Sequence, residues 1–237
     1  MSSVHMALVV TRKEVKNIFR NRGLLFAGLY IGVMFGALNV LLLGQVSAVN
    51  NTAYSVALLV GVFVGYSFSG SVFLREKRDR VIETLLCTPL SLKSIWSGKV
   101  LAVTIPAYLF SLLSVSLVLI LSDFMAGRLL LPSIPILIHV LVVMPIFIAS
   151  AVGLIGLSQF LLGMRENRII GVLVILILLP FVYPSILGGL TQGNMNVEAS
   201  WFEVEATLIA SVILLALTTY LTRYLNKERV VTTIPSD

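Results

Sequence analysis

The stretch Arg75–Lys99, REKRDRVIETLLCTPLSLKSIWSGK, is the only long polar interruption in an otherwise apolar sequence. It carries six cations and three acids between two runs that have no charged residue. Asp79 can N-cap a short helix that Pro89 ends, and four apolar residues would share one side of that helix: Val81, Ile82, Leu85 and Leu86. Ser91 can cap a second helix that leads to Lys99. The stretch is either a docking helix for a partner or a connector at the lipid headgroups.

The composition around this stretch is that of a membrane protein. Of the 237 residues, 58% are hydrophobic and only 12% are charged, against about 25% charged in soluble domains. A helix needs about 20 apolar residues to cross a bilayer. The uncharged runs therefore predict an all-α integral membrane protein of one domain with six crossings, at 24–44, 54–74, 100–122, 134–160, 169–189 and 206–224.

A helix over residues 7–22 is expected to precede the first crossing. Its apolar side carries Leu8, Val15, Ile18 and Phe19, and a separate side carries Lys13, Lys16 and Arg20. This pattern favours an interfacial helix with its apolar side in lipid and its basic side toward the headgroups, over a helix packed on a partner.

The basic residues predict the orientation in the membrane. With both termini in the cytosol, 16 of the 17 Lys and Arg residues are cytosolic and only Arg128 is outside. This is a strong positive-inside bias. Because the cations flank the crossings, they favour contact with anionic membrane lipids and not with nucleic acid. The single Cys87 cannot form a disulfide within the chain. We expect a multi-pass protein of the cell membrane.

Small residues recur in the first two predicted crossings. Glycines that would let helices pack closely lie at Gly28, Gly32, Gly36, Gly61 and Gly65. Packing within one chain is the default expectation, and packing across a dimer is the alternative.

The outer half of the predicted bundle contains three unusual features. Pro145 should kink the fourth crossing. His139 is an ionisable group at membrane depth, which raises the hypothesis of a functional site, although we favour a neutral histidine that is hydrogen-bonded to a neighbouring helix or exposed. Pro180, Tyr183 and Pro184 suggest a broken helix or a bend near 180–203.

Several catalytic motifs are missing from the sequence. The only Gly-Lys pair, Gly98-Lys99, lacks the rest of a P-loop, so the chain is not expected to bind or hydrolyse ATP itself. One cysteine and two histidines make a metal site improbable. No base lies at catalytic spacing from Ser67 or Ser69, and no catalytic residue is predicted.

Taken together, the sequence resembles the membrane-spanning permease subunits of ABC-2 type transporters. The resemblance covers nearly the whole chain in layout, and its most specific part is the run from Arg75 through Thr88-Pro89-Leu90-Ser91 to Gly98-Lys99. This run is similar to the family's "E…GT-E-LL-TPLS…GK" pattern, although Arg80-Val81-Ile82 replaces the commoner Gly-Thr-hydrophobic step.

The resemblance implies a role for the stretch. The helix at 79–87 would be the coupling helix, which sits in a cleft of a separate ATP-binding subunit. Its contacts would be Asp79, Arg80, Ile82, Glu83, Leu85 and Leu86. The resemblance also implies a translocation path lined by crossings two and five, with Ser67, Ser69 and Tyr183 as candidates. Two permease chains, identical or different, and two ATP-binding subunits would form an exporter, with ATP and Mg²⁺ bound by the partner and no cofactor bound by this chain. A membrane-embedded enzyme acting on lipid and a membrane assembly factor without transport remain as alternatives.

Overall fold

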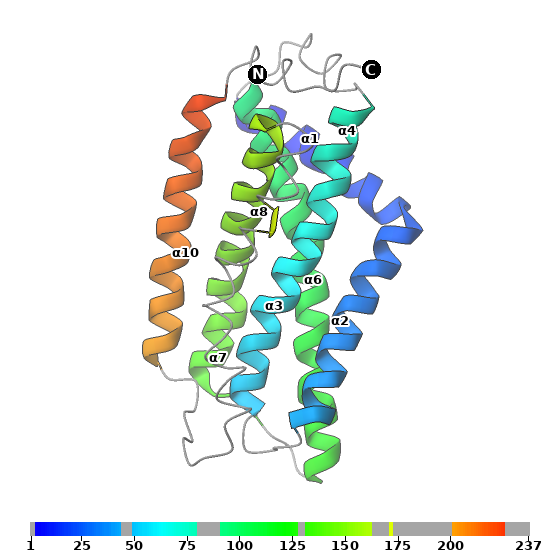
Figure 1. The fold of residues 1–237 in the computed structure, drawn as a ribbon. Helices are drawn as coiled ribbons and strands as arrows, with labels where there is room; N and C mark the ends of the chain where they lie inside the picture. Colours follow the sequence, from blue (N-terminus) through cyan, green and yellow to red (C-terminus); the bar gives the residue numbers. More distant parts are fainter. Residues whose placement is uncertain are drawn as a thin grey trace.

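The computed structural model describes residues 3–43, 49–79, 91–127, 131–162, 171–172 and 201–225. In these ranges the chain forms helices and no strand. Four helical segments are long and apolar enough to cross a membrane: Val49–Arg78, Leu92–Ala126, Ile134–Leu161 and Trp201–Tyr224. A fifth span is possible when the bent pair of helices at the N-terminus counts as one. The described residues thus have the character of a multi-pass membrane helix bundle (Figure 1).

The N-terminal pair consists of α1 (Ser3–Arg20) and α2 (Arg22–Leu43), which meet at Asn21 with a bend of 79°. Helix α2 runs along the bundle, whereas α1 lies across one end of it (Figure 1). The prediction of a separate helix before the first crossing agrees with this arrangement. The face assigned to lipid was partly wrong, because Ile18 is buried in the bundle while Leu8 and Phe19 are exposed. The buried stripe of α1 is Ala7, Val10, Thr11, Glu14 and Ile18.

The described parts of the polar stretch are helical at Arg75–Arg78 and from Leu92 onward; the second helix was predicted, whereas the first helix was expected to begin only at Asp79. Helix α3 (Val49–Ser69) continues through the π-helical segment η2 (Gly70–Leu74) into α4 (Arg75–Arg78). On the other side, Ser91 begins α6 (Leu92–Ala126) by accepting a hydrogen bond from the Ser94 amide at 3.2 Å, as predicted for a cap. Both helices therefore extend past the uncharged runs and carry charged residues on regular helix.

The fourth predicted crossing is one continuous helical span. It consists of α7 (Ile134–Ile138), the π-helical segment η3 (His139–Val143) and α8 (Met144–Leu161). Pro145 cannot donate a backbone hydrogen bond, and the wider turn of η3 lies directly before it. We infer that the π-helical turn accommodates the proline where the sequence had suggested a kink.

Helix α10 (Trp201–Leu221) packs along α8 and is followed by the short 3₁₀ segment η4 (Thr222–Tyr224). Near the start of both spans, Tyr54 contacts His139 of η3 and Thr207 of α10. Further along, a Cβ on Gly153 of α8 would lie 3.6 Å from the hydroxyl of Thr218 of α10. Both helices therefore run in the same direction (Figure 1). Helix α8 ends at the end of the bundle where α1 lies, and α10 begins at the opposite end.

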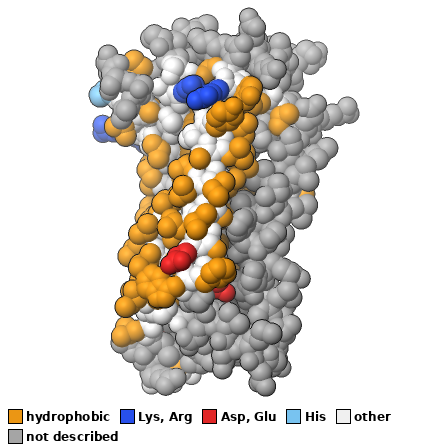
Figure 2. All heavy atoms as spheres, turned by 90° about the vertical axis from the view of Figure 1, so that its left-hand side faces the viewer, with side chains coloured by type: hydrophobic (Ala, Val, Ile, Leu, Met, Phe, Trp, Pro, Cys, Tyr) orange, Lys and Arg blue, Asp and Glu red, His pale blue; other side chains and the backbone are white. Residues whose placement is uncertain are grey.

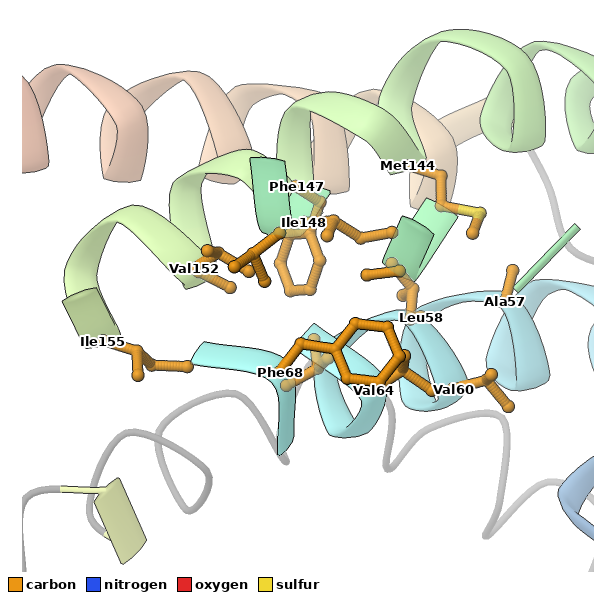
Figure 3. Close-up of a cluster of buried hydrophobic side chains, with 14 of the residues drawn as sticks. Ala57, Leu58, Val60, Val64, Phe68, Met144, Phe147, Ile148, Val152 and Ile155 are labelled. Carbon is orange, nitrogen blue, oxygen red and sulfur yellow. The ribbon is translucent and has the colours of Figure 1, made fainter. Parts of the chain in front are cut away.

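The core lies between α3 and α8. Ala57, Leu58, Val60, Val64 and Phe68 of α3 face Met144, Phe147, Ile148, Val152 and Ile155 of α8 (Figure 3). The predicted glycine faces lie at such contacts within this chain. Gly28, Gly32 and Gly36 lie against Phe110 and Ser114 of α6, while Gly61 and Gly65 lie against Ile148 and Val152.

The outward face of α10 is apolar along most of its length (Figure 2). Acidic side chains lie toward one end of this face and basic side chains toward the other (Figure 2). Its exposed apolar residues include Phe202, Ile209, Ile213, Leu217 and Tyr220. An apolar band of this kind is what a lipid-facing helix presents.

Candidate functional site

Lys99 is buried where α6 passes η2 and α4. Its side chain is 1% exposed, and its Nζ lies 2.6 Å from Glu76 Oε2, whose side chain is 14% exposed. The ammonium also donates to the carbonyl oxygen of Val72 at 2.7 Å and lies 5.5 Å from the centre of the Phe73 ring. Val72 is in the π-helical segment η2. The backbone hydrogen bonds of a π-helix join residues five apart and not four apart, and this change of partners leaves a carbonyl oxygen available to a side chain. Lys99 thus fixes α6 to the end of α3.

Lys77 makes a second connection from α4, to the end of α8. It is fully buried, and its Nζ donates to the carbonyl oxygen of Leu162 at 2.7 Å and to those of Gln159 and Phe160 at 3.4 Å. The last carbonyls of a helix have no partner within it, and a cation there also complements the helix dipole. Lys77 therefore satisfies the carboxyl end of α8 and ties it to α4.

The first turns of α6 also contact α1 and α8, through hydrogen bonds and a close backbone approach. The Thr11 hydroxyl of α1 donates to the Gly98 carbonyl oxygen at 3.0 Å, and a Cβ on Gly98 would lie 2.7 Å from the Ala7 carbonyl oxygen. Trp96 Nε1 donates to the Gly153 carbonyl oxygen at 3.3 Å. We call Glu76, Lys77, Lys99, Gly98 and Thr11, with these partners, the charged junction. It joins α1, α4, α6 and α8 at one end of the bundle.

The sequence analysis counted Lys77 and Lys99 among the cytosolic cations of the polar stretch and did not predict that both are buried. A signal was present for Lys99, because it shares one helical face with Ile95, Trp96, Ala102 and Val103, all of which are buried. A lysine in an apolar stripe requires a buried partner. Glu76 lies 23 residues earlier in the chain, so the pairing itself could not be read from local spacing.

Asp79 does not have the backbone conformation of an N-cap. It ends α4 with φ −83° and ψ 8°, whereas an N-cap residue is extended. Its carboxylate is held by Arg75 at 3.4 Å and by Arg78 at 3.6 Å. The predicted contacts at Arg80, Ile82, Glu83, Leu85 and Leu86 lie outside the described residues, so the coupling helix stays a prediction.

Among the candidates for a polar path, only the serines of α3 are described. Ser69 is fully buried and accepts from Gln159 Nε2 of α8 at 3.4 Å, while Ser67 is half-buried. Tyr183 lies outside the described residues. Ser69 is thus part of the contact between α3 and α8 in the single chain, and its role in a path stays a prediction.

His139 is buried and has no hydrogen-bond partner in the part of the chain that the structure describes, contrary to the interpretation favoured from the sequence. It is 0% exposed, and neither ring nitrogen has a hydrogen-bond partner among the described residues. Its ring lies over Tyr54, with the ring centres 4.2 Å apart, and the Tyr54 hydroxyl pairs with that of Thr207 on α10. The aromatic contact packs this imidazole between α3 and α10.

The geometry defines a class of protein: a multi-pass membrane helix bundle whose helices are joined by buried charges at one end. Comparison with known proteins adds no narrower name, since neither a family model nor a curated protein matches the chain.

Proposed function

We propose that this chain is the permease subunit of an ATP-binding cassette exporter of the ABC-2 type, driven by a separate ATP-binding subunit. The observation that carries the proposal is the charged junction. Helix α4 and helix α6 are the elements on either side of residues 80–90, where the resemblance locates the coupling helix. Glu76 of α4 is bonded to Lys99 of α6 at 2.6 Å.

A device that transmits motion from a partner needs a stiff connection to the helices that move. The ion pair between Glu76 and Lys99 restrains the two ends of the 80–90 segment relative to each other. Lys77 extends the restraint to α8, and Thr11 extends it to α1. A push on the segment would therefore reach four helices together, and this supports a role in coupling over a role as a passive connector.

The directions of the helices support the six-crossing layout of such a permease. Helix α8 ends near α1 and α10 starts at the opposite end of the bundle (Figure 1), which is what we expect if the interval between them contains the crossing predicted at 169–189, a stretch that lies almost wholly outside the described residues. One further crossing in this interval would give six. The ends of α4 and α10 lie at the same end of the bundle as α1, which is the side predicted to be cytosolic (Figure 1).

The test is to purify the full chain with the ATP-binding subunit that accompanies it and to measure ATP hydrolysis in lipid vesicles. We expect hydrolysis to depend on this chain, and a Leu85→Lys variant to assemble but lose the coupling between hydrolysis and export. The matched control is Leu131→Lys, the same substitution at an exposed site (78% exposed) between α6 and α7.

Two results would contradict the proposal. One is the absence of any P-loop subunit from the purified complex. The other is equal coupling in the Leu85→Lys and Leu131→Lys variants, which would favour an assembly factor. A lipid-acting enzyme would instead modify lipid without the partner.

A further inference from the structure

Lys99 lies near two buried carboxylates that belong to different helices. Glu76 of α4 is its bonded partner, at 2.6 Å from the Nζ atom. The second is Glu14 of α1, which is only 5% exposed. Its carboxylate attracts the Lys99 ammonium electrostatically, although no hydrogen bond joins the two groups. A buried lysine thus has two carboxylates within its electrostatic range and is bonded to one of them.

The bonds of Glu14 do not account for its burial. Its cation is Lys13, which lies at 3.5 Å and is 58% exposed. Its Oε2 atom accepts a hydrogen bond from Asn17 Nδ2, also at 3.5 Å. An ion pair with an exposed lysine at such a distance contributes little to stability, whereas a buried carboxylate needs a well-bonded partner. Glu14 is therefore buried with weaker partners than its environment requires.

Helix α1 directs Glu14 toward α6. Glu14 belongs to the buried stripe of α1, one turn after Thr11, and the Thr11 hydroxyl donates to the Gly98 carbonyl oxygen at 3.0 Å. Lys99 is the next residue of α6. Glu14 and Glu76 also line one groove of about 410 Å³ between α1, the start of α2 and the η2–α4 segment. A carboxylate that loses Lys99 can therefore turn into this polar space and stay hydrated.

We propose that Lys99 exchanges partners between these two acids. In the described arrangement it holds α6 to α4 through Glu76, and in a second arrangement it holds α6 to α1 through Glu14. A lysine suits such an exchange, because its ammonium has three donors and sits on a flexible four-carbon chain. The first arrangement is favoured at rest, since the ammonium also bonds the Val72 carbonyl oxygen at 2.7 Å. A movement of α4 that breaks these bonds leads to the second arrangement.

A double-mutant cycle on the full chain in bicelles tests the exchange. Glu76→Gln alone should be partly compensated, because Lys99 turns to Glu14. In a Glu14→Gln background Lys99 has no acid left, and Glu76→Gln should lower the equilibrium constant for folding by about tenfold more than it does in the wild-type chain. The matched control is Asp79→Asn, which removes a groove acid held by two arginines of α4 and should combine additively with Glu76→Gln.

Distances between spin labels give a readout that a fixed ion pair would not change. In a chain without its native cysteine, one pair of labels would join Arg12 of α1 to Lys93 of α6, and another would join Arg78 of α4 to Lys93; all three positions are exposed. We expect Glu76→Gln to broaden the α4–α6 distance distribution and to narrow the α1–α6 distribution. Adding Glu14→Gln should abolish the narrowing.

Two results would overturn the exchange. One is additive losses of stability for Glu14→Gln and Glu76→Gln. The other is an α1–α6 distance distribution that is the same in Glu76→Gln as in the wild-type chain. The exchange goes beyond the proposed transport and does not rest on it, because both measurements use this chain alone and neither measures ATP hydrolysis. Its failure would leave the test of coupling unaffected.

Discussion

One end of the helix bundle and its middle are held together by different interactions. At the charged junction, α4 is joined to α6 and α8 by ammonium groups at 2.6 and 2.7 Å from their acceptors. Along the middle, α2 approaches α6 at Gly32 and Gly36, and α3 approaches α8 at Gly61 and Gly65. In lipid the hydrophobic effect does not drive helices together. Close approach of the backbones at small residues lets van der Waals packing hold the helices together. The middle depends on many weak contacts, whereas the junction depends on a few strong ones.

This contrast predicts that Lys99→Met causes the largest loss of stability. The variant leaves the Glu76 carboxylate nearly buried without its cation, and breaking a buried pair in this way costs about 3–5 kcal/mol. The free energy of unfolding in bicelles would measure the loss. The double variant Glu76→Gln, Lys99→Met should recover much of it, because no unpaired charge remains. Additive losses in the double variant would show that the two groups do not act as a pair.

Gly98→Ala should have the next largest effect. The new Cβ would lie 2.7 Å from the Ala7 carbonyl oxygen and 2.9 Å from Val10 Cβ, so α1 has to move away from α6. Overpacking of this kind costs about 1–3 kcal/mol, and faster proteolysis near Thr11 would report the displaced helix.

Gly70→Ala is the matched control for this variant, since a Cβ there meets nothing within 4 Å. We expect it to be neutral or slightly stabilising, because alanine favours helix over glycine. Equal losses of stability in Gly98→Ala and Gly70→Ala would mean that the loss comes from the backbone change and not from overpacking against α1.

The positions of the helices could be predicted from the sequence better than the contacts that join them. The uncharged runs that fall within the described residues coincide with helices, because a bilayer-spanning helix needs a long stretch without charge. Ser91 was also recognisable as a cap from local chemistry alone. The end of the α3 span was misplaced because a buried partner allows a charged residue to continue a helix past an uncharged run, and Lys77 is such a residue.

The connections could not be predicted because they join distant segments. Lys77 bonds carbonyls 82 to 85 residues later in the chain, and those carbonyls are free only because α8 ends there. The face of α1 was misassigned for a related reason. Its buried stripe includes Thr11 and Glu14, which a hydrophobicity pattern assigns to solvent, and Thr11 is buried because Gly98 lets α1 approach.

The smallest predicted effect is that of a single hydroxyl in the middle of the bundle. The Ser114 hydroxyl donates to the Gly32 carbonyl oxygen of α2 at 2.8 Å, across the contact made by the glycines. Interhelical hydrogen bonds in membranes contribute about 0.6 kcal/mol on average, so Ser114→Ala should cost about that much in the free energy of unfolding. Ser116→Ala is the control, because the Ser116 hydroxyl donates to Leu112 within α6 and is exposed. A loss in Ser114→Ala as large as that in Lys99→Met would mean that polar bonds, and not close packing, also hold the middle of the bundle.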